Sequence, residues 1–249
     1  MVIQDFCTHL PGLSPQTRLS YRTTLRSFLS WAHVFRHLPQ DLSRAASVAR
    51  QYRQTRLPDT LSASAVEALL DAVDRSTPIG RRDYAVLLLA ARYGLRPSDI
   101  RALCLEHIDW RRGQITLQQT KTGHPITLPL LSDVAQALVA YLQAGRPATT
   151  TRQVFVRHKV FFVPFVFENN LATIMRAALC RVGLINRPGR HGLYLLRHTL
   201  ATRLLAAGQP IKTIGDILGH RSLDATVGYT QIDLPALRTV AIAEAEVLR

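Results

Sequence analysis

The stretches "LLRHTLATRLL" (195–205) and "LGHRSLDATVGYTQID" (218–233) decide how this chain is interpreted. The first places Arg197 among leucines, in a pattern typical of an apolar helix. An arginine is costly to bury there unless an anion meets it. The stretch therefore predicts either a structural Asp or Glu partner or a bound phosphate. The second places His220 after a glycine and Tyr229 nine residues later.

Two more cations lie in special positions. Arg96 stands just before Pro97 at the start of a predicted helix, where backbone amides and the helix dipole favour an anion. Arg96 and Arg197 could therefore grip one phosphate between them. Lys121 lies between two threonines in a predicted turn. A turn lysine is usually only solvated, but lysine can give up a proton where arginine cannot.

Other polar residues of these stretches have ordinary explanations as well. A tyrosine such as Tyr229 usually packs, and it becomes a candidate nucleophile only when cations hold the scissile group beside it. His198 follows Arg197 on the helix, and we expect it to pack in the core.

Composition favours a nucleic-acid partner. The chain has 249 residues, 47% of them hydrophobic, so it can bury a core. Its net charge is +14, and lysine occurs only at positions 121, 159 and 212, so arginine supplies most of the positive charge. A basic surface of this kind suits a polyanion. The alternatives are a generally basic proteome or a ribosome-type partner.

Cysteine spacing and hydropathy exclude several classes. Cys7, Cys104 and Cys180 have no paired spacing, so they predict neither a zinc site nor a disulfide framework. We expect buried, reduced thiols in a cytoplasmic protein. The N-terminus carries no signal-peptide pattern, and the apolar runs are too short to span a membrane.

The segment 13–33 predicts a basic amphipathic helix. Ser14 is a candidate N-cap and Pro15 a first helical residue. Five apolar residues recur at helical spacing: Tyr21, Leu25, Phe28, Leu29 and Ala32. A stripe formed by Arg18, Arg22 and Arg26 runs beside them and suits contact with DNA phosphates, although each arginine could equally be a solvated surface residue. Residues 1–57 carry 8 Arg and 2 acidic residues, which favours DNA contact.

The rest of the chain is predicted to be mainly α with a small antiparallel β-sheet. Leu57–Pro58 indicates a domain boundary near residue 57, and Ser64 with Glu67 has capping-box spacing. "GQITLQQTKTGHPITLPL" (113–130) predicts a β-hairpin with Gly123 in its turn. Residues 147–165 are interpreted as a strand followed by a loop. Helices are predicted over 83–93, from 97 onward, and over 132–144, 168–182, 194–207, 210–218 and 222–231, with a short one in the tail.

Four stretches together resemble the successive conserved boxes of the tyrosine recombinase (phage integrase) family. They are "YGLRPSDIRALCLEHIDW" (93–110), "TKTGHPITLPL" (120–130), "LLRHTLATRLLAAG" (195–208) and "LGHRSLDATVGYTQID" (218–233). The resemblance covers about 58–240 and implies a catalytic recombinase domain at 58–249. Matched residue by residue, it implies an active site of Arg96, Lys121, Arg197, His220 and Tyr229.

The resemblance also implies a mechanism and partners. Arg96 and Arg197 would hold the phosphate oxygens of double-stranded DNA, Tyr229 would attack phosphorus, Lys121 would protonate the leaving 5′ oxygen, and His220 would donate a hydrogen bond. The product is a 3′-phosphotyrosyl intermediate. Such an enzyme, of the integrase or transposase type, needs no metal or nucleotide cofactor and acts as a homotetramer on two DNA sites.

Two departures from the family pattern stand out. Tyr194 occupies the position, three before Arg197, where the family usually has a histidine, and the nearest upstream histidine is His191. The region 1–57 is shorter than the family's usual DNA-binding domain, so we expect a partial helical DNA-binding domain there. The alternatives are a truncated, non-catalytic DNA-binding relic of an integrase, and a topoisomerase-like enzyme that relaxes DNA without pairing two sites.

Overall fold

The computed structural model describes residues 13, 15–46, 59–159, 161–165 and 171–219. The chain divides into two compact units, Met1–Thr55 (unit 1) and Arg56–Arg249 (unit 2). Among the described residues, no helix combines the length and the apolar character that crossing a membrane requires.

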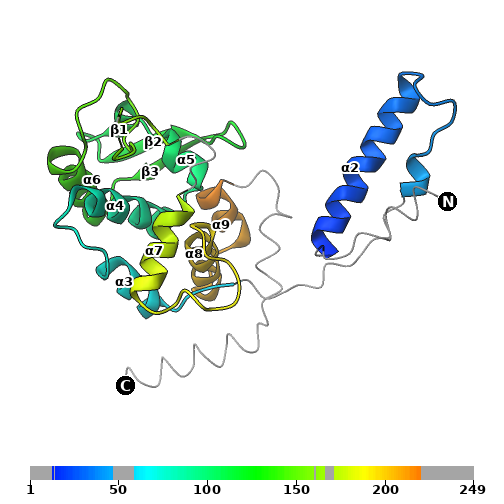
Figure 1. The fold of residues 1–249 in the computed structure, drawn as a ribbon. Coiled ribbons are helices and arrows are strands. Elements are labelled where there is room, and N and C mark those ends of the chain that lie inside the picture. The colour runs from blue at the N-terminus through cyan, green and yellow to red at the C-terminus, as the bar shows by residue number, and fades with distance from the viewer. Residues whose placement is uncertain (1–12, 14, 47–58, 160, 166–170, 220–249) are drawn as a thin grey trace, which may run out of the picture. The chain divides into compact units, whose positions relative to one another are not determined.

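Helices make up most of the described chain, with one small sheet (Figure 1). Unit 1 contains α2 (Pro15–Val34) and the 3-10 turn η1 (Ser43–Ala46). Unit 2 contains α3 (Ala63–Asp71), α4 (Pro78–Tyr93), α5 (Pro97–Ala102), η2 (Leu105–His107), β1 (Ile108–Asp109), β2 (Gln114–Gln118), β3 (Pro125–Pro129), α6 (Ser132–Ala144), α7 (Ala172–Arg181), α8 (Tyr194–Ala206) and α9 (Ile211–Leu218).

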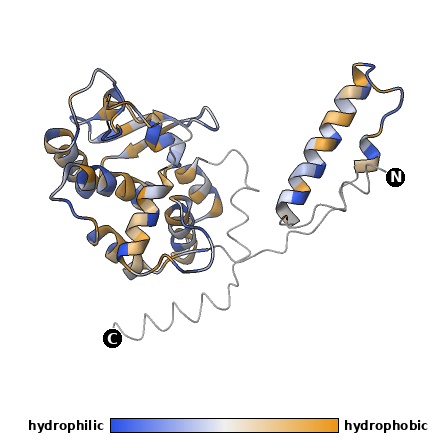
Figure 2. Cartoon of the chain, viewed as in Figure 1, coloured by the Kyte–Doolittle hydropathy of each residue, from blue (hydrophilic) through white to orange (hydrophobic). Residues whose placement is uncertain are grey.

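In unit 1, one side of α2 packs on the turn η1. Leu29 and Ala46 are buried there, and Leu25 packs against them. Tyr21 and Phe28 are 52% and 56% exposed, so the prediction that all five apolar positions share a buried face is wrong for these two. Figure 2 shows hydrophobic and hydrophilic residues alternating along α2.

The centre of unit 2 is α4, which packs against α3, α5, α6, α7 and α8. Val86, Leu87 and Leu89 are fully buried, so the helix is apolar on most sides, as expected of a central helix. Its end at Gly94 was predicted, because glycine adopts the left-handed conformation, here φ 62°, without a Cβ clash. Its start was not: Thr77 caps the helix through a bond from the Gly80 amide, ahead of the predicted start at residue 83.

The sheet is antiparallel with strand order β1-β2-β3. The predicted hairpin of β2 and β3 is confirmed, with Ile115 opposite Leu128 and Leu117 opposite Ile126. Ile115, Leu117 and Leu128 are buried while their strand neighbours are exposed, which is the expected period of two. In Figure 1 the sheet lies at the upper end of unit 2, away from α3.

Several local predictions needed correction. The N-cap of α3 is Ser62, whose side chain accepts from the Ala65 amide, so the Ser64–Glu67 capping box is wrong. Glu67 instead pairs with Arg92. In the described part of 147–165, single β-bridges replace the predicted strand, since Cys104 pairs only with Gln153 and Val156 only with Pro164.

The remaining outcomes are mixed. The helix over 132–144 is confirmed as α6, and α8 and α9 each lie within one residue of prediction. Cys104 is partly exposed and Cys180 exposed, so neither is the buried thiol that the sequence predicted. The predicted helix over 222–231, the tail helix and Cys7 lie outside the described residues.

Candidate active site

Two buried arginines from distant segments reach the same turn at the end of α9. Arg96 is the residue before α5, and Arg197 lies in the first turn of α8. Arg96 Nη2 donates to the Gly219 carbonyl at 3.0 Å, and Arg197 Nη2 donates to the Leu218 carbonyl at 2.7 Å. The guanidinium groups therefore bind consecutive carbonyls of one chain segment. Arg96 and Arg197 expose only 6% and 4% of their surfaces.

Glycine makes this convergence possible at two points. Arg197 Nη1 also donates to the Gly94 carbonyl at 2.6 Å. A Cβ on Gly94 would lie 2.7 Å from Cδ2 of Leu218, so a side chain there would push the ends of α4 and α9 apart. Gly219 has φ 63°, and a Cβ on it would overlap the side-chain amide of Gln119. At both positions the space that a Cβ would need is taken by a neighbouring side chain.

The acidic partner of Arg96 is Asp99. Asp99 is fully buried, and its Oδ2 lies 3.7 Å from Nη1 of Arg96. Its Oδ1 accepts from the Thr120 amide at 2.9 Å, at the start of the turn that carries Lys121. The hydrogen bonds of Arg197 described above end on neutral carbonyls. A phosphate entering here would replace these dipoles with a full negative charge, to which guanidinium binds more strongly.

The sequence interpretation missed Gln119, which is buried beside Arg96. Its Oε1 accepts from Arg96 Nη1 at 3.0 Å, and its Nε2 donates to the Leu218 carbonyl at 3.3 Å. A signal was available: Gln119 continues the alternation of Ile115 and Leu117 and therefore faces the core. A polar residue at a core-facing position needs partners, and these turn out to be site residues.

Lys121 is exposed in the turn between β2 and β3. The turn closes at Gln119, whose carbonyl accepts from the Gly123 amide at 2.8 Å and whose amide donates to the His124 carbonyl at 2.9 Å. Lys121 therefore lies two residues after Gln119, the residue that closes the turn and also accepts a hydrogen bond from Arg96.

Tyr194 is the first residue of α8 and is 43% exposed. It lies three residues before Arg197, and this spacing makes the two residues neighbours on the helix surface. His191 instead contacts the Arg187 carbonyl at 3.0 Å. His198 lies 2.6 Å from Arg190 Nη1. Burial first, and then the charges of Arg190 and Arg197, lower the pKa of His198 to about 4, so it is neutral at physiological pH.

His220 and Tyr229 lie outside the described residues. In the sequence His220 directly follows Gly219, whose carbonyl is bound by Arg96. The three predicted DNA-binding arginines lie on α2 in unit 1. Arg26 is exposed, Arg22 is partly exposed, and Arg18 Nε donates to the Leu13 carbonyl at 3.0 Å.

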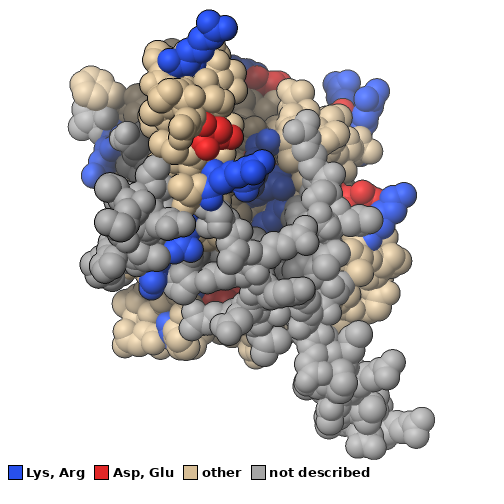
Figure 3. Space-filling view, turned by 90° about the vertical axis from the view of Figure 1, so that its right-hand side faces the viewer, with Lys and Arg blue, Asp and Glu red and all other residues tan. Residues whose placement is uncertain are grey.

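Basic side chains outnumber acidic ones in the sequence, 31 to 17. On the face shown in Figure 3, Lys and Arg likewise cover more of the described surface than Asp and Glu. In the part of the chain that the structure describes, no group of three or more His, Cys, Asp or Glu residues is arranged to hold a metal ion.

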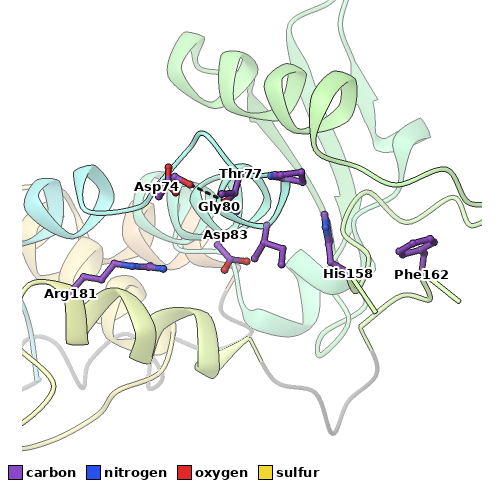
Figure 4. A pocket seen from close by; sticks show the side chains of 9 residues that line it. Asp74, Thr77, Gly80, Asp83, His158, Phe162 and Arg181 are labelled. Carbon is purple, nitrogen blue, oxygen red and sulfur yellow. Dashed lines mark hydrogen bonds between the residues drawn. The ribbon is translucent and has the colours of Figure 1, made fainter. Parts of the chain in front are cut away.

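A pocket of about 580 Å³ opens at the start of α4, and its lining includes none of the predicted site residues (Figure 4). Asp83, His158 and Arg181 point toward it. Burial raises the pKa of Asp83 despite its ion pair with Arg82 at 2.7 Å. The lining contains neither arginine of the pair, so this pocket and the arginine cluster are separate features.

Comparisons with known proteins agree on one family. Residues 59–234 match the model of the phage integrase family. The "Putative integrase/recombinase y4rA" of Sinorhizobium fredii is 40% identical over 220 residues, which are 88% of this chain and 53% of that protein. A second protein of that organism with the same description, y4gC, is 39% identical over 187 residues, which are 75% of this chain and 95% of that protein. The chain thus spans about half the length of y4rA.

The fold has a solved counterpart. The XerH site-specific recombinase bound to palindromic difH substrate, in a post-cleavage complex, superposes with a TM-score of 0.77 at 20% identity. The match covers 96% of this chain and 70% of that one. This likeness establishes the mainly helical recombinase fold with its small antiparallel sheet.

Proposed function

Because the chain belongs to the phage integrase family, we propose that it is a DNA strand transferase that performs site-specific recombination or integration in the cytoplasm. The observation that carries the proposal is the convergence of Arg96 and Arg197 on the Leu218–Gly219 carbonyls. Two buried guanidinium groups aimed at one small region are suited to the two non-bridging oxygens of a phosphodiester.

The proposed reaction needs a nucleophile, an acceptor for the proton of that nucleophile, and an acid. Tyr229 Oη gives its proton to solvent hydroxide and attacks phosphorus, the bond to the 5′ oxygen breaks, and the DNA 3′ end becomes a phosphotyrosyl ester. The ammonium of Lys121 gives its proton to the departing 5′ oxygen. Arg96 and Arg197 stabilise the charge that gathers on the phosphate oxygens, and His220 donates a further hydrogen bond. The reverse sequence rejoins a strand.

Tyr194 is assigned a weaker version of the histidine role. Its hydroxyl can donate a hydrogen bond to the phosphate from the first turn of α8. A tyrosine hydroxyl can donate a hydrogen bond but is a poor proton acceptor, whereas an imidazole can both donate a hydrogen bond and move protons.

Double-stranded DNA is the proposed substrate, held in part by the exposed basic surface. The net charge of +14 and the stripe Arg18, Arg22 and Arg26 support phosphate contacts. XerH was solved on its difH DNA substrate, and this neighbour is the reason to expect a duplex. We extend the proposal to a homotetramer on two paired DNA sites.

A trapping experiment tests the proposal without knowledge of the target sequence. The protein is incubated with nicked duplexes that carry a randomised central segment, so that cleavage near the nick releases a short strand and cannot be reversed. We expect covalent protein–DNA complexes that survive denaturing detergent, and sequencing their DNA gives the site.

The Tyr229→Phe variant should form no such complex while binding DNA within a few fold of the parent. Binding without a covalent complex in the parent would contradict the proposal and favour a non-catalytic relic. Covalent complexes without recombinant product would favour the topoisomerase-like alternative.

A further inference from the structure

We propose that Gln119 is a positioning residue that fixes the Lys121 turn against Arg96 and against the chain entering His220. This inference rests on the proposed function and concerns the same site. Gln119 does not touch DNA in this role; it acts through the residues that do.

The side chain of Gln119 joins three separate parts of unit 2. Oε1 accepts from Arg96 Nη1 at 3.0 Å and from Thr122 Oγ1 at 2.9 Å, and Nε2 donates to the Leu218 carbonyl at 3.3 Å. Arginine can only donate and a carbonyl can only accept, so these partners fix which end of the amide faces which neighbour. With 2% exposure, water cannot readily replace any of these bonds.

The backbone of Gln119 fixes the turn as well. Its amide and carbonyl bind His124 and Gly123, which closes the loop that contains Lys121. The Thr120 amide binds Asp99, which itself faces Arg96. A shift of Gln119 would therefore move the lysine relative to the arginine. Catalysis is sensitive to such shifts, since a displacement of about 1 Å can cost about 100-fold in rate.

The chemistry of the site favours glutamine at this position. Glutamate could accept from Arg96 and Thr122, but it has no proton for the Leu218 carbonyl and adds a negative charge where a phosphate must bind. Methionine has a similar length, but it would leave Arg96 Nη1 without this buried acceptor. Gly219 matches this arrangement, because a Cβ there would overlap the amide.

The contacts of the Leu218 carbonyl show how the uncharged amide of Gln119 could hold the end of α9 in place. Its carbonyl accepts from both Arg197 and Gln119. When a phosphate takes over the arginine donors, the amide of Gln119 still binds the Leu218 carbonyl. The end of α9, and with it the start of the segment leading to His220, would then keep its place while the arginines change partners.

The test compares two leaving groups on DNA recovered from the trapping experiment. In one duplex the scissile phosphate has its normal 5′ oxygen, and in the other a 5′ bridging sulfur, which leaves as a thiolate and does not need the lysine proton. Single-turnover cleavage is measured for the parent, Gln119→Met, and Lys121→Ala as the reference for a lost acid. Gln114→Met is the matched control, because Gln114 is exposed on β2, the strand that Gln119 directly follows.

We expect Gln119→Met to cleave the oxygen substrate about 100-fold more slowly than the parent and the sulfur substrate less than tenfold more slowly. Lys121→Ala should show the same preferential loss on the oxygen substrate. Gln114→Met should match the parent on both. Equal losses of Gln119→Met on the two substrates, or no loss on either, would overturn the proposal. A parent that forms no covalent complex on any duplex would instead overturn the proposed function, so the two failures are distinguishable.

A milder variant keeps the test usable if Gln119→Met does not fold, as judged by circular dichroism. Thr122→Val removes the 2.9 Å hydrogen bond from Thr122 Oγ1 to Gln119 together with the long 3.5 Å one from the His124 amide, and it keeps the side-chain shape. The same preferential loss on the oxygen substrate is expected, at about tenfold, which is a small part of the roughly 100- to 10,000-fold that general acid catalysis contributes. Unchanged cleavage of both substrates by a folded Thr122→Val would count against the proposal.

Discussion

Gly94→Ala should destabilise unit 2 more than its backbone conformation alone requires. Gly94 has φ 62°, where an alanine costs about 1–2 kcal/mol. The new Cβ would also lie 2.7 Å from Leu218 Cδ2 and 3.2 Å from Leu200 Cδ2. Leu218 is 1% exposed and cannot turn away freely, so overpacking adds about 1–3 kcal/mol. The expected total loss in unfolding free energy is about 2–5 kcal/mol.

Gly113 is a matched control for this prediction. It has the same φ, 62°, but a Cβ there would meet nothing within 4 Å. Gly113→Ala should therefore cost only the conformational part, about 1–2 kcal/mol. Urea unfolding of both variants gives the difference, and Tm should follow at about 2–4 °C per kcal/mol for a unit of this size. Equal losses in the two variants would refute the idea that Gly94 sets the approach of α4 to α9.

Three further results are expected. The rate of single-turnover cleavage should rise from pH 7 to pH 9 in the parent. Tyr194→His should raise the rate at pH 7 by about tenfold. If the rates of Tyr194→His and Tyr194→Phe both match the parent, position 194 has no proton role. Thr199→Val should cost about 1–3 kcal/mol in unfolding free energy, because its buried hydroxyl accepts from the Leu61 amide at 3.0 Å; Thr199→Ser keeps the hydroxyl, and an equal loss there would contradict the explanation. His198 takes up a proton near pH 6.5 when unfolded but only near pH 4 when folded. The unfolding free energy should therefore fall as pH drops between these values, by about 1–2 kcal/mol after allowance for partial exposure. A His198→Gln variant with the same pH slope in urea unfolding would refute this.

Local signals in the sequence were sufficient for much of unit 2. The hairpin and α6 follow from period and turn chemistry, and Gly94 and Gly219 mark helix ends because each takes a positive φ. The start of α4 was placed too late because the capping residue Thr77 lies outside the apolar run. Segment 147–165 has β-type composition, but its described part finds only single-bridge partners, and composition cannot reveal the lack of a neighbouring strand.

The sequence singled out Arg96 and Arg197 as a pair, but it did not reveal their contacts. Arg197 stood out as an arginine among leucines and Arg96 as an arginine at the start of a predicted helix, and the order of the motifs linked them. Their partners in the structure include the backbone carbonyls of Gly94, Leu218 and Gly219. Every residue has a backbone carbonyl, so residue types do not show which carbonyls will accept from an arginine. These contacts are set by how α4, α8 and α9 pack. Gln119 was missed for a related reason: its importance lies in joining segments that are distant in the chain.

The most direct test of the account is to locate the covalent bond between protein and DNA. The trapped complex is digested with protease and nuclease, and the modified peptide is sequenced by mass spectrometry. The account predicts a nucleotide attached through its 3′ phosphate to Tyr229, and no adduct in Tyr229→Phe. An adduct on another residue, or DNA cleavage without any adduct, would contradict it.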